Sequence, residues 1–150
     1  MNPMDNPALI SGKTNPRAIT IAYWIVTGLF CLEMIFTAYY ELLVLPQAAE
    51  AFTRLGFPAG YFRVELSWAK VAGVLALLVP MRPARINIWI KEWAYAGFAI
   101  NLVSALTAHV SIHDRPAAFA PSSLTSVLWA LSYYFWHRLQ TAYAIREHDI

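Results

Sequence analysis

Charge is scarce in this sequence and cysteine is almost absent, and both features limit what the chain can be. Charged residues make up 13% of its 150 residues and hydrophobic residues make up 59%, whereas soluble proteins average roughly 25% and 45–50%. Such a chain has more apolar surface than its own core can cover, so we expect lipid to cover the remainder. The net charge is only +2 and the basic residues form no long patch, which argues against a nucleic-acid partner.

Cys31 is the only cysteine. This excludes an intramolecular disulfide, a Cys-x-x-Cys redox pair, covalently attached c-type haem and a cysteine-rich zinc site within these residues. Any redox chemistry would therefore need a bound cofactor or a partner subunit. A single thiol in an apolar helix is typical of ordinary packing.

Long apolar runs dominate the rest of the sequence. Four of them predict transmembrane helices over about residues 19–45, 61–79, 92–110 and 122–139, because about 20 apolar residues cross the bilayer hydrocarbon. Residues 47–58 show helical apolar spacing but are too short to cross, which predicts an interfacial helix. Residues 81–91 predict a basic connector. The expected fold is all-α: a four-transmembrane-helix bundle over residues 19–139, with a short interfacial helix between helices 1 and 2 and polar tails at 1–18 and 140–150.

The basic residues predict the orientation of this bundle. Four crossings place both termini on one side, together with seven basic residues: Lys13, Arg17, Arg82, Arg85, Lys91, Arg138 and Arg146. The other side holds three, namely Arg54, Arg63 and Arg115. Because cytoplasmic loops carry the excess of Lys and Arg, we expect both termini in the cytoplasm and a multi-pass location in the plasma membrane.

Ionisable side chains interrupt the apolar runs and are the candidate catalytic residues. Glu33 and Lys70 fall near the bilayer midplane by helical rise, which predicts a buried ion pair with either a structural or a proton-transfer role. Glu41, Glu65 and His109 fall in the outer quarter, where they predict a second polar cluster. That cluster would be a proton relay, a metal site or the polar mouth of a ligand pocket.

Spacing restricts the cofactors. Glu41, Glu65 and His109 come from three helices and show no i, i+3 or i, i+4 ligand pair, so we predict no metal site. His109 and His137 would lie about 25 Å apart along the helices, which excludes bis-His haem and leaves single-His ligation through His109.

Four further residues of the apolar runs carry expectations. Trp68, Asn101 and Tyr40 are candidates to line a pocket for a planar ligand such as a quinone. Glu92, at the inner boundary, is expected to meet lipid headgroups or the neighbouring Arg85 and Lys91.

Two stretches carry a resemblance to a known family. Residues 56–80, GFPAGYFRVELSWAKVAGVLALLVP, and residues 91–100, KEWAYAGFAI, resemble the DoxX-like family of small bacterial membrane proteins, and the similarity extends over about residues 19–139. The resemblance implies a four-helix plasma-membrane protein. Its founding members are associated with thiosulfate oxidation coupled to quinone, and others with oxidative-stress complexes. The positions that match the family pattern are Glu65, Lys70, Glu92, Trp93 and His109.

Three functions remain open at this point. The first is a membrane component of a redox or quinone-linked system, which would bind a quinone or a redox partner protein. The second is a self-contained membrane enzyme that performs acid/base chemistry, for example isomerisation, on a small lipophilic substrate. The third is a structural or assembly protein without catalysis. A homo-oligomer is compatible with each of them.

Overall fold

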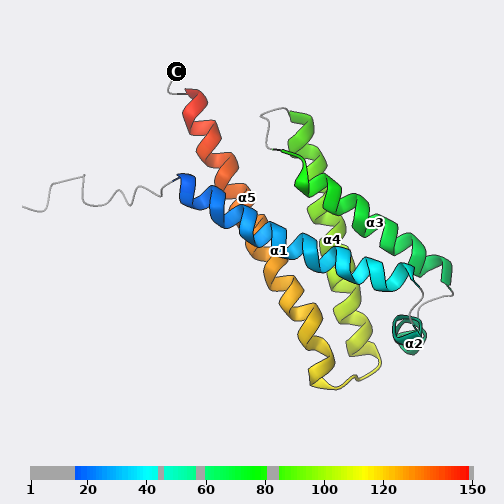
Figure 1. Cartoon of the computed structure of the whole chain (residues 1–150). Helices are drawn as coiled ribbons and strands as arrows, with labels where there is room; N and C mark the ends of the chain where they lie inside the picture. The colour runs from blue at the N-terminus through cyan, green and yellow to red at the C-terminus, as the bar shows by residue number, and fades with distance from the viewer. Residues whose placement is uncertain (1–15, 44–45, 57–59, 81–84, 149–150) are drawn as a thin grey trace, which may run out of the picture.

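The computed structural model describes residues 16–43, 46–56, 60–80 and 85–148, and its regular structure is entirely helical over these ranges. The four long helices are α1 (Pro16–Leu42), α3 (Gly60–Leu78), α4 (Arg85–Ser111) and α5 (Ala120–His148), as Figure 1 shows. A short helix α2 (Pro46–Arg54) joins α1 to α3, and a 3-10 helix η2 (Pro116–Phe119) precedes α5. The predicted all-α class is confirmed. The predicted tail at 1–18 lies outside the described residues except for its last three.

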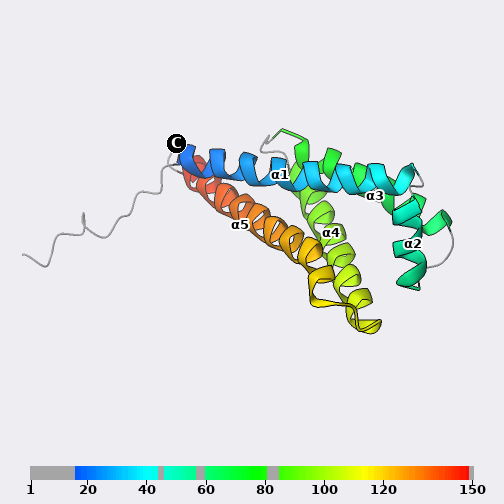
Figure 2. The ribbon, with the colours of Figure 1, turned by 60° about the horizontal axis from the view of Figure 1, so that its bottom comes forward.

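The four long helices are arranged as a ring, in which each has two of the others as its main neighbours. Helix α1 contacts α3 and α5, and α4 contacts the same two helices. Figures 1 and 2 show α1 running beside α3, while α4 and α5 extend away from this pair. The start of α1 and the end of α5 lie at one end of the molecule, and α2 lies at the other. Residues far apart in sequence therefore meet between α1, α4 and α5 and between α3 and α4.

Aromatic and aliphatic side chains fill the space where the helices cross. The buried cluster contains Tyr23, Phe30, Cys31, Met34, Val74, Leu77, Tyr95, Phe98, Trp136 and Leu139. Phe30 of α1 meets Phe98 of α4 edge-on, with ring centroids 5.0 Å apart and planes at 84°, an arrangement that aromatic pairs favour. Cys31 is buried and free, in agreement with its expected packing role.

Two boundaries of the long helices differ from the prediction by more than three residues. Helix α4 begins at Arg85 rather than at Glu92, so part of the predicted connector is helical. The reason is that Lys91 does not reach toward solvent but is completely buried within the helix packing. Helix α5 continues to His148 rather than ending at Leu139, because the polar residues that follow extend the helix beyond its apolar run.

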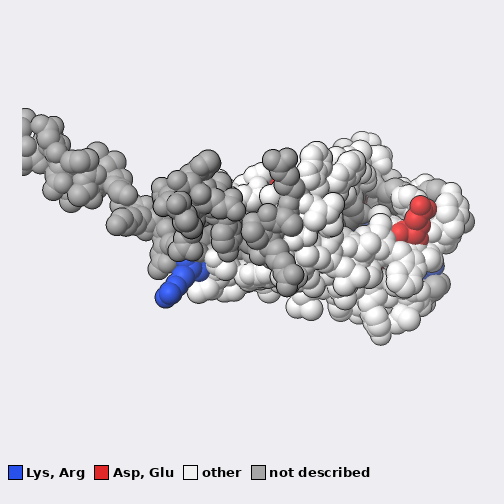
Figure 3. Space-filling view, turned by 90° about the horizontal axis from the view of Figure 1, so that it is seen from above, with Lys and Arg blue, Asp and Glu red and all other residues white. Residues whose placement is uncertain are grey.

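The surface is unusually apolar. Large hydrophobic side chains are exposed along all four long helices, for example Leu32 (68%), Leu75 (63%), Ile100 (70%) and Leu124 (64%). On the face in Figure 3, the visible Lys, Arg, Asp and Glu side chains lie mainly near the two ends, and the described surface between them is mostly uncharged. Two helices, α1 from Arg17 and α4 from Ile86, are long and apolar enough to cross a membrane, and only 28% and 22% of their most apolar windows are buried. A surface of this kind is suited to contact with lipid.

Candidate functional site

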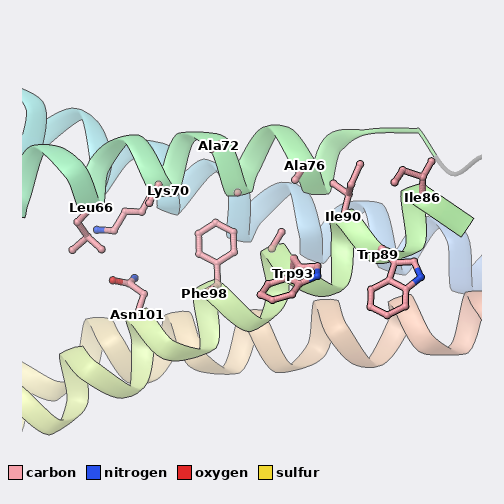
Figure 4. Close-up of a pocket in the computed structure, with 14 residues that line it drawn as sticks. Leu66, Lys70, Ala72, Ala76, Ile86, Trp89, Ile90, Trp93, Phe98 and Asn101 are labelled. Carbon is pink, nitrogen blue, oxygen red and sulfur yellow. The ribbon is translucent and has the colours of Figure 1, made fainter.

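An elongated groove separates α3 from α4. Its volume is about 670 Å³, within the range of small-molecule sites. Helix α3 contributes mainly small side chains and α4 contributes the bulky ones; the lining consists of Leu66, Ala69, Lys70, Ala72, Gly73, Ala76, Ile86, Trp89, Ile90, Trp93, Ala94, Gly97, Phe98 and Asn101. Figure 4 shows Lys70 and Asn101 at one end of the groove and Trp89 with Ile86 at the other. The groove is therefore polar at one end and apolar at the other.

Small residues keep the groove open, and a glycine brings its two walls together at one point. A Cβ atom on Gly73 would lie 2.7 Å from the ring of Phe98, closer than packed carbon atoms approach. A Cβ atom on Gly97 would meet nothing within 4 Å. Gly73 thus permits contact between α3 and α4, whereas Gly97 leaves free space inside the groove.

A buried ion pair closes the polar end. Lys70 Nζ lies 2.6 Å from Glu41 Oε1, and the two side chains are only 8% and 11% exposed. Ser67 Oγ lies 3.0 Å from Glu41 Oε2 and 2.8 Å from the carbonyl of Arg63. The pair joins α1 to α3, and Lys70 presents its side chain to the groove.

The prediction that Lys70 pairs with Glu33 is wrong, since its partner is Glu41. Glu41 lies one residue before the end of α1, whereas Lys70 lies ten residues into α3. The start of α3 therefore extends past the end of α1, as is visible in Figure 1. The predicted depths assumed level helix ends, and this offset brings Glu41 rather than Glu33 to Lys70.

Glu33 is left half-buried on α1, and its Oε2 atom is buried without a hydrogen-bond partner. The Thr125 side chain of α5 lies beside it, and the Lys70 ammonium acts on it electrostatically. Glu33 is therefore not part of the Glu41–Lys70 pair, and one of its carboxylate oxygens is left without a partner.

The predicted cluster of Glu41, Glu65 and His109 is not brought together. His109 Nδ1 lies 2.8 Å from Asp114 Oδ2, and Glu65 is exposed. Among the described residues, no group of three or more His, Cys, Asp or Glu side chains is placed to hold a metal ion.

Asp114 instead ties α2 to the end of α4. Both terminal guanidinium nitrogens of Arg54 donate to its carboxylate, Nη2 at 2.9 Å and Nη1 at 3.3 Å. The hydrogen bond with His109, helped by the Arg115 backbone N–H and the charge of Arg54, holds the pKa of the Asp114 carboxyl below its usual value. This ion-pair cluster anchors α2 and does not extend to the groove.

The three residues predicted to bind a cofactor are not brought together either. Asn101 lines the groove. Trp68 is 60% exposed, and Tyr40 is 39% exposed and packs against Phe36 with ring centroids 4.6 Å apart. Trp68 and Tyr40 do not line the groove, and the indoles that do are Trp89 and Trp93 of α4.

Lys91 forms a second buried polar centre that the sequence does not reveal. It is fully buried, and its ammonium contacts the carbonyl of Leu77 near the end of α3 and the hydroxyl of Tyr23, the latter at 3.4 Å. The Trp24 and Trp136 rings lie 6.0 and 5.4 Å from it, within the range of cation–π attraction. A buried ammonium is thus stabilised by a helix C-terminus and two indoles.

Three hydroxyl groups form a second buried network, which joins α1, α4 and α5. Ser132 Oγ of α5 lies 2.7 Å from both Thr27 Oγ1 of α1 and Tyr95 Oη of α4. The helical spacing of Tyr23 with Thr27, and of Lys91 with Tyr95, is the only sequence signal for this network, since residues four apart share a helix face.

Glu92 also differs from its expected contacts with lipid headgroups or with Arg85 and Lys91. Its carboxylate accepts hydrogen bonds from Trp136 Nε1 at 2.9 Å and from Tyr133 Oη at 3.2 Å. His137 lies 3.5 Å away. The carboxylate therefore binds α5, with polar aromatic side chains as its partners.

Comparison with known proteins supports one assignment. Neither the curated proteins nor the solved structures gave a match to the chain. The profile of the DoxX-like family matches residues 25–131, a range that contains the Glu41–Lys70 pair, the groove and Lys91. With most of its length covered, and with apolar helices that suit a membrane, the chain belongs to the DoxX-like family.

Proposed function

We propose that this DoxX-like protein crosses the bacterial plasma membrane four times, through α1, α3, α4 and α5, with both termini in the cytoplasm. Each of these helices carries exposed apolar side chains that lipid would cover. Helix α3 is the shortest, and its 19 residues span about 28 Å at 1.5 Å per residue, close to the hydrocarbon thickness. The excess of basic residues on the side of the termini supports the orientation.

Cysteine labelling tests this topology. Arg115 and Thr141 are exposed and would lie on opposite sides of the membrane. In a Cys31→Ala background, Arg115→Cys is expected to react with a membrane-impermeant maleimide in spheroplasts, whereas Thr141→Cys reacts only after the membrane is opened. Labelling of both positions in sealed spheroplasts would contradict the proposed orientation.

We further propose that the groove binds a quinone and that the chain serves as a membrane component of a redox system. The observation that supports this most directly is the polarity of the groove, which has Lys70 and Asn101 at one end and apolar or aromatic side chains along the rest. Quinone carbonyls accept hydrogen bonds from an ammonium or a carboxamide. With the quinone head group at the Lys70 end, an isoprenoid chain would extend between the alanine wall of α3 and the indoles of Trp89 and Trp93 toward the other end.

The position of the groove fits a ligand supplied by the bilayer. Ile86, Trp89 and Trp93 line the groove and are 64%, 64% and 73% exposed. With α3 and α4 in a membrane, these side chains face lipid, so a lipophilic molecule can enter from the side. Because the sequence has a single cysteine, it offers no dithiol pair for two-electron exchange, and a partner protein is proposed to exchange electrons with the quinone.

Two glycines provide a matched test of quinone binding. A side chain at Gly97 would grow into the groove, whereas Gly28 is exposed on α1 outside it, and a Cβ at either position meets nothing within 4 Å. Gly97→Leu is expected to weaken binding of a short-chain ubiquinone about tenfold or more, a change of at least about 1.4 kcal/mol. Gly28→Leu should bind as wild type does. Binding is measured by quenching of tryptophan fluorescence in detergent.

Both substitutions raise helix propensity by a similar amount, so a difference between them reports on the groove and not on folding. Equal affinity in the two variants would place the quinone elsewhere. No measurable binding in the wild-type protein would contradict the quinone proposal itself.

A further inference from the structure

Arg63, in the first turn of α3, is buried without a partner for its charge. Its exposed fraction is only 7%, whereas the side chain of Arg54, which pairs with Asp114, is 57% exposed. Nη1 of Arg63 is buried and makes no hydrogen bond, and no carboxylate of the described residues pairs with this guanidinium. A guanidinium carries five N–H donors and a permanent positive charge, so leaving one unpaired inside a protein is costly.

Positive charge is in excess among the buried residues. In the part of the chain that the structure describes, the buried charged residues are Arg63, Lys70, Lys91 and Glu41. Both oxygens of Glu41 are used, since they lie 2.6 Å from Lys70 Nζ and 3.0 Å from Ser67 Oγ. Lys91 contacts the carbonyl of Leu77 near the other end of α3. Of these four residues, Arg63 is the one whose charge is not compensated.

The two other acidic residues of α1 and α3 do not supply the missing anion. Glu65 comes two residues after Arg63, about 200° around the helix, and it is exposed. Glu33 lies two turns before Glu41 on α1. Because α1 and α3 run in opposite directions (Figure 1), Glu33 lies beyond Lys70 as seen from Arg63. An anion for Arg63 is therefore expected from outside these two helices.

The guanidinium of Arg63 lies against the N-terminus of α3. Its Nη2 atom is 3.7 Å from the position that a Cβ atom on Gly60 would occupy, and Gly60 is the first residue of this 19-residue helix. The first N–H groups of a helix have no partner within it, and the helix dipole places partial positive charge at the same end. A cation there is unfavourable unless an anion neutralises both. Gly60 and Tyr61 are exposed, so an anion has access from this side.

We propose that Arg63 and the first turn of α3 bind a phosphate group, at a site that is separate from the groove. Arg binds two phosphate oxygens side by side, and helix N-termini bind phosphate through their free N–H groups. With α3 across the membrane, its fourth residue lies at the height of the lipid headgroups. A phospholipid headgroup is therefore the favoured source of the phosphate, and free phosphate is the other. The site does not depend on quinone binding.

Native mass spectrometry of the delipidated protein tests this site, with short-chain phosphatidylglycerol as the probe and diacylglycerol of the same chain length as the control without phosphate. Arg63→Gln is expected to weaken binding of phosphatidylglycerol about tenfold or more, the effect of losing a hydrogen bond to a charged group. Arg115→Gln, which removes an exposed charge on the same side of the membrane, should bind as wild type does. Equal binding of the two lipids by the wild type, or equal binding of phosphatidylglycerol by Arg63→Gln and wild type, would overturn the proposal.

Inorganic phosphate, added as a competitor, distinguishes the two sources. Displacement of phosphatidylglycerol from the wild type would support a site that also accepts free phosphate. Retention of the lipid would support a site that requires the headgroup at the membrane surface. In both cases the preference for the phosphate-containing lipid must depend on Arg63.

Thermal unfolding in detergent free of phosphate and phospholipid provides a second measurement. Arg63→Gln should be at least as stable as wild type there, because it removes an unpartnered buried charge. A less stable or unfolded Arg63→Gln would show that the guanidinium has a partner within the protein, and would overturn the site. Gly60→Asp places a carboxylate within reach of Arg63 and should raise the unfolding midpoint and abolish lipid binding, whereas Gly60→Asn, of equal size, should retain binding. A Gly60→Asp variant that binds phosphatidylglycerol as wild type does would also contradict the proposal.

Discussion

Lys70→Met is expected to destabilise the protein by about 3–5 kcal/mol, the usual cost of removing one partner of a buried ion pair. The variant would leave Glu41 in a site where its side chain is 11% exposed, with the Ser67 hydroxyl as its remaining neighbour. The methionine has a similar volume, so the loss reports charge rather than packing. The measurement is the midpoint of thermal unfolding in detergent, followed by intrinsic fluorescence.

A double variant distinguishes the ion pair from other causes. Lys70→Met combined with Glu41→Gln removes both charges and should recover much of the lost stability, because replacing a whole buried pair is often nearly neutral. Both the single and the double variant should lose quinone affinity, since Lys70 lines the groove. A single variant as stable as wild type would show that Glu41 does not depend on Lys70.

Lys91→Met is expected to cost about 1.5–3 kcal/mol, the range for a hydrogen bond that involves a charged group. The substitution leaves the Leu77 carbonyl without its ammonium and removes the cation from between Trp24 and Trp136. Because Leu77 is in the last turn of α3, the effect should be concentrated there. Hydrogen exchange followed by mass spectrometry should show faster exchange in the peptide that contains the end of α3, and less change at its start.

Arg138→Met is the matched control for this experiment. Arg138 lies 5.9 Å from the Tyr134 ring but is exposed, so its cation–π contact is worth less than a buried one. Its removal should leave the unfolding midpoint within a degree or two of wild type. Equal effects of the two substitutions would mean that burial of Lys91 contributes nothing to stability.

The helical class follows from the sequence because apolar runs of sufficient length alternate with segments rich in Pro, Gly and charge. Helix α2 follows from its apolar spacing in the same way. The start of α4 does not follow from the sequence, because the basic residues Arg85 and Lys91 predict a connector rather than a helix. The charge of Lys91 is compatible with burial only because the end of another helix, α3, supplies a carbonyl. That partner depends on tertiary packing and leaves no local signal.

The candidate site was predictable in its residue types but not in its pairings. An ionisable residue within an apolar run is an evident candidate, and Lys70 and Glu41 are found paired at one end of the groove. Their pairing depends on how far α3 extends past α1, which no spacing within one helix encodes. The hydroxyl network of Thr27, Tyr95 and Ser132 has only helical spacing as a sequence signal, and that signal is weak because single hydroxyls are common in apolar helices.

The lateral opening of the groove has a consequence for selectivity. A ligand that enters from the bilayer has already left water, so its apolar tail gains little further transfer free energy when it passes from lipid to the alanine wall of α3. Discrimination among lipophilic molecules must then come from the head group at Lys70 and Asn101. The relevant concentration is the mole fraction of the molecule in the membrane, and a site of modest intrinsic affinity would be occupied whenever that fraction is high.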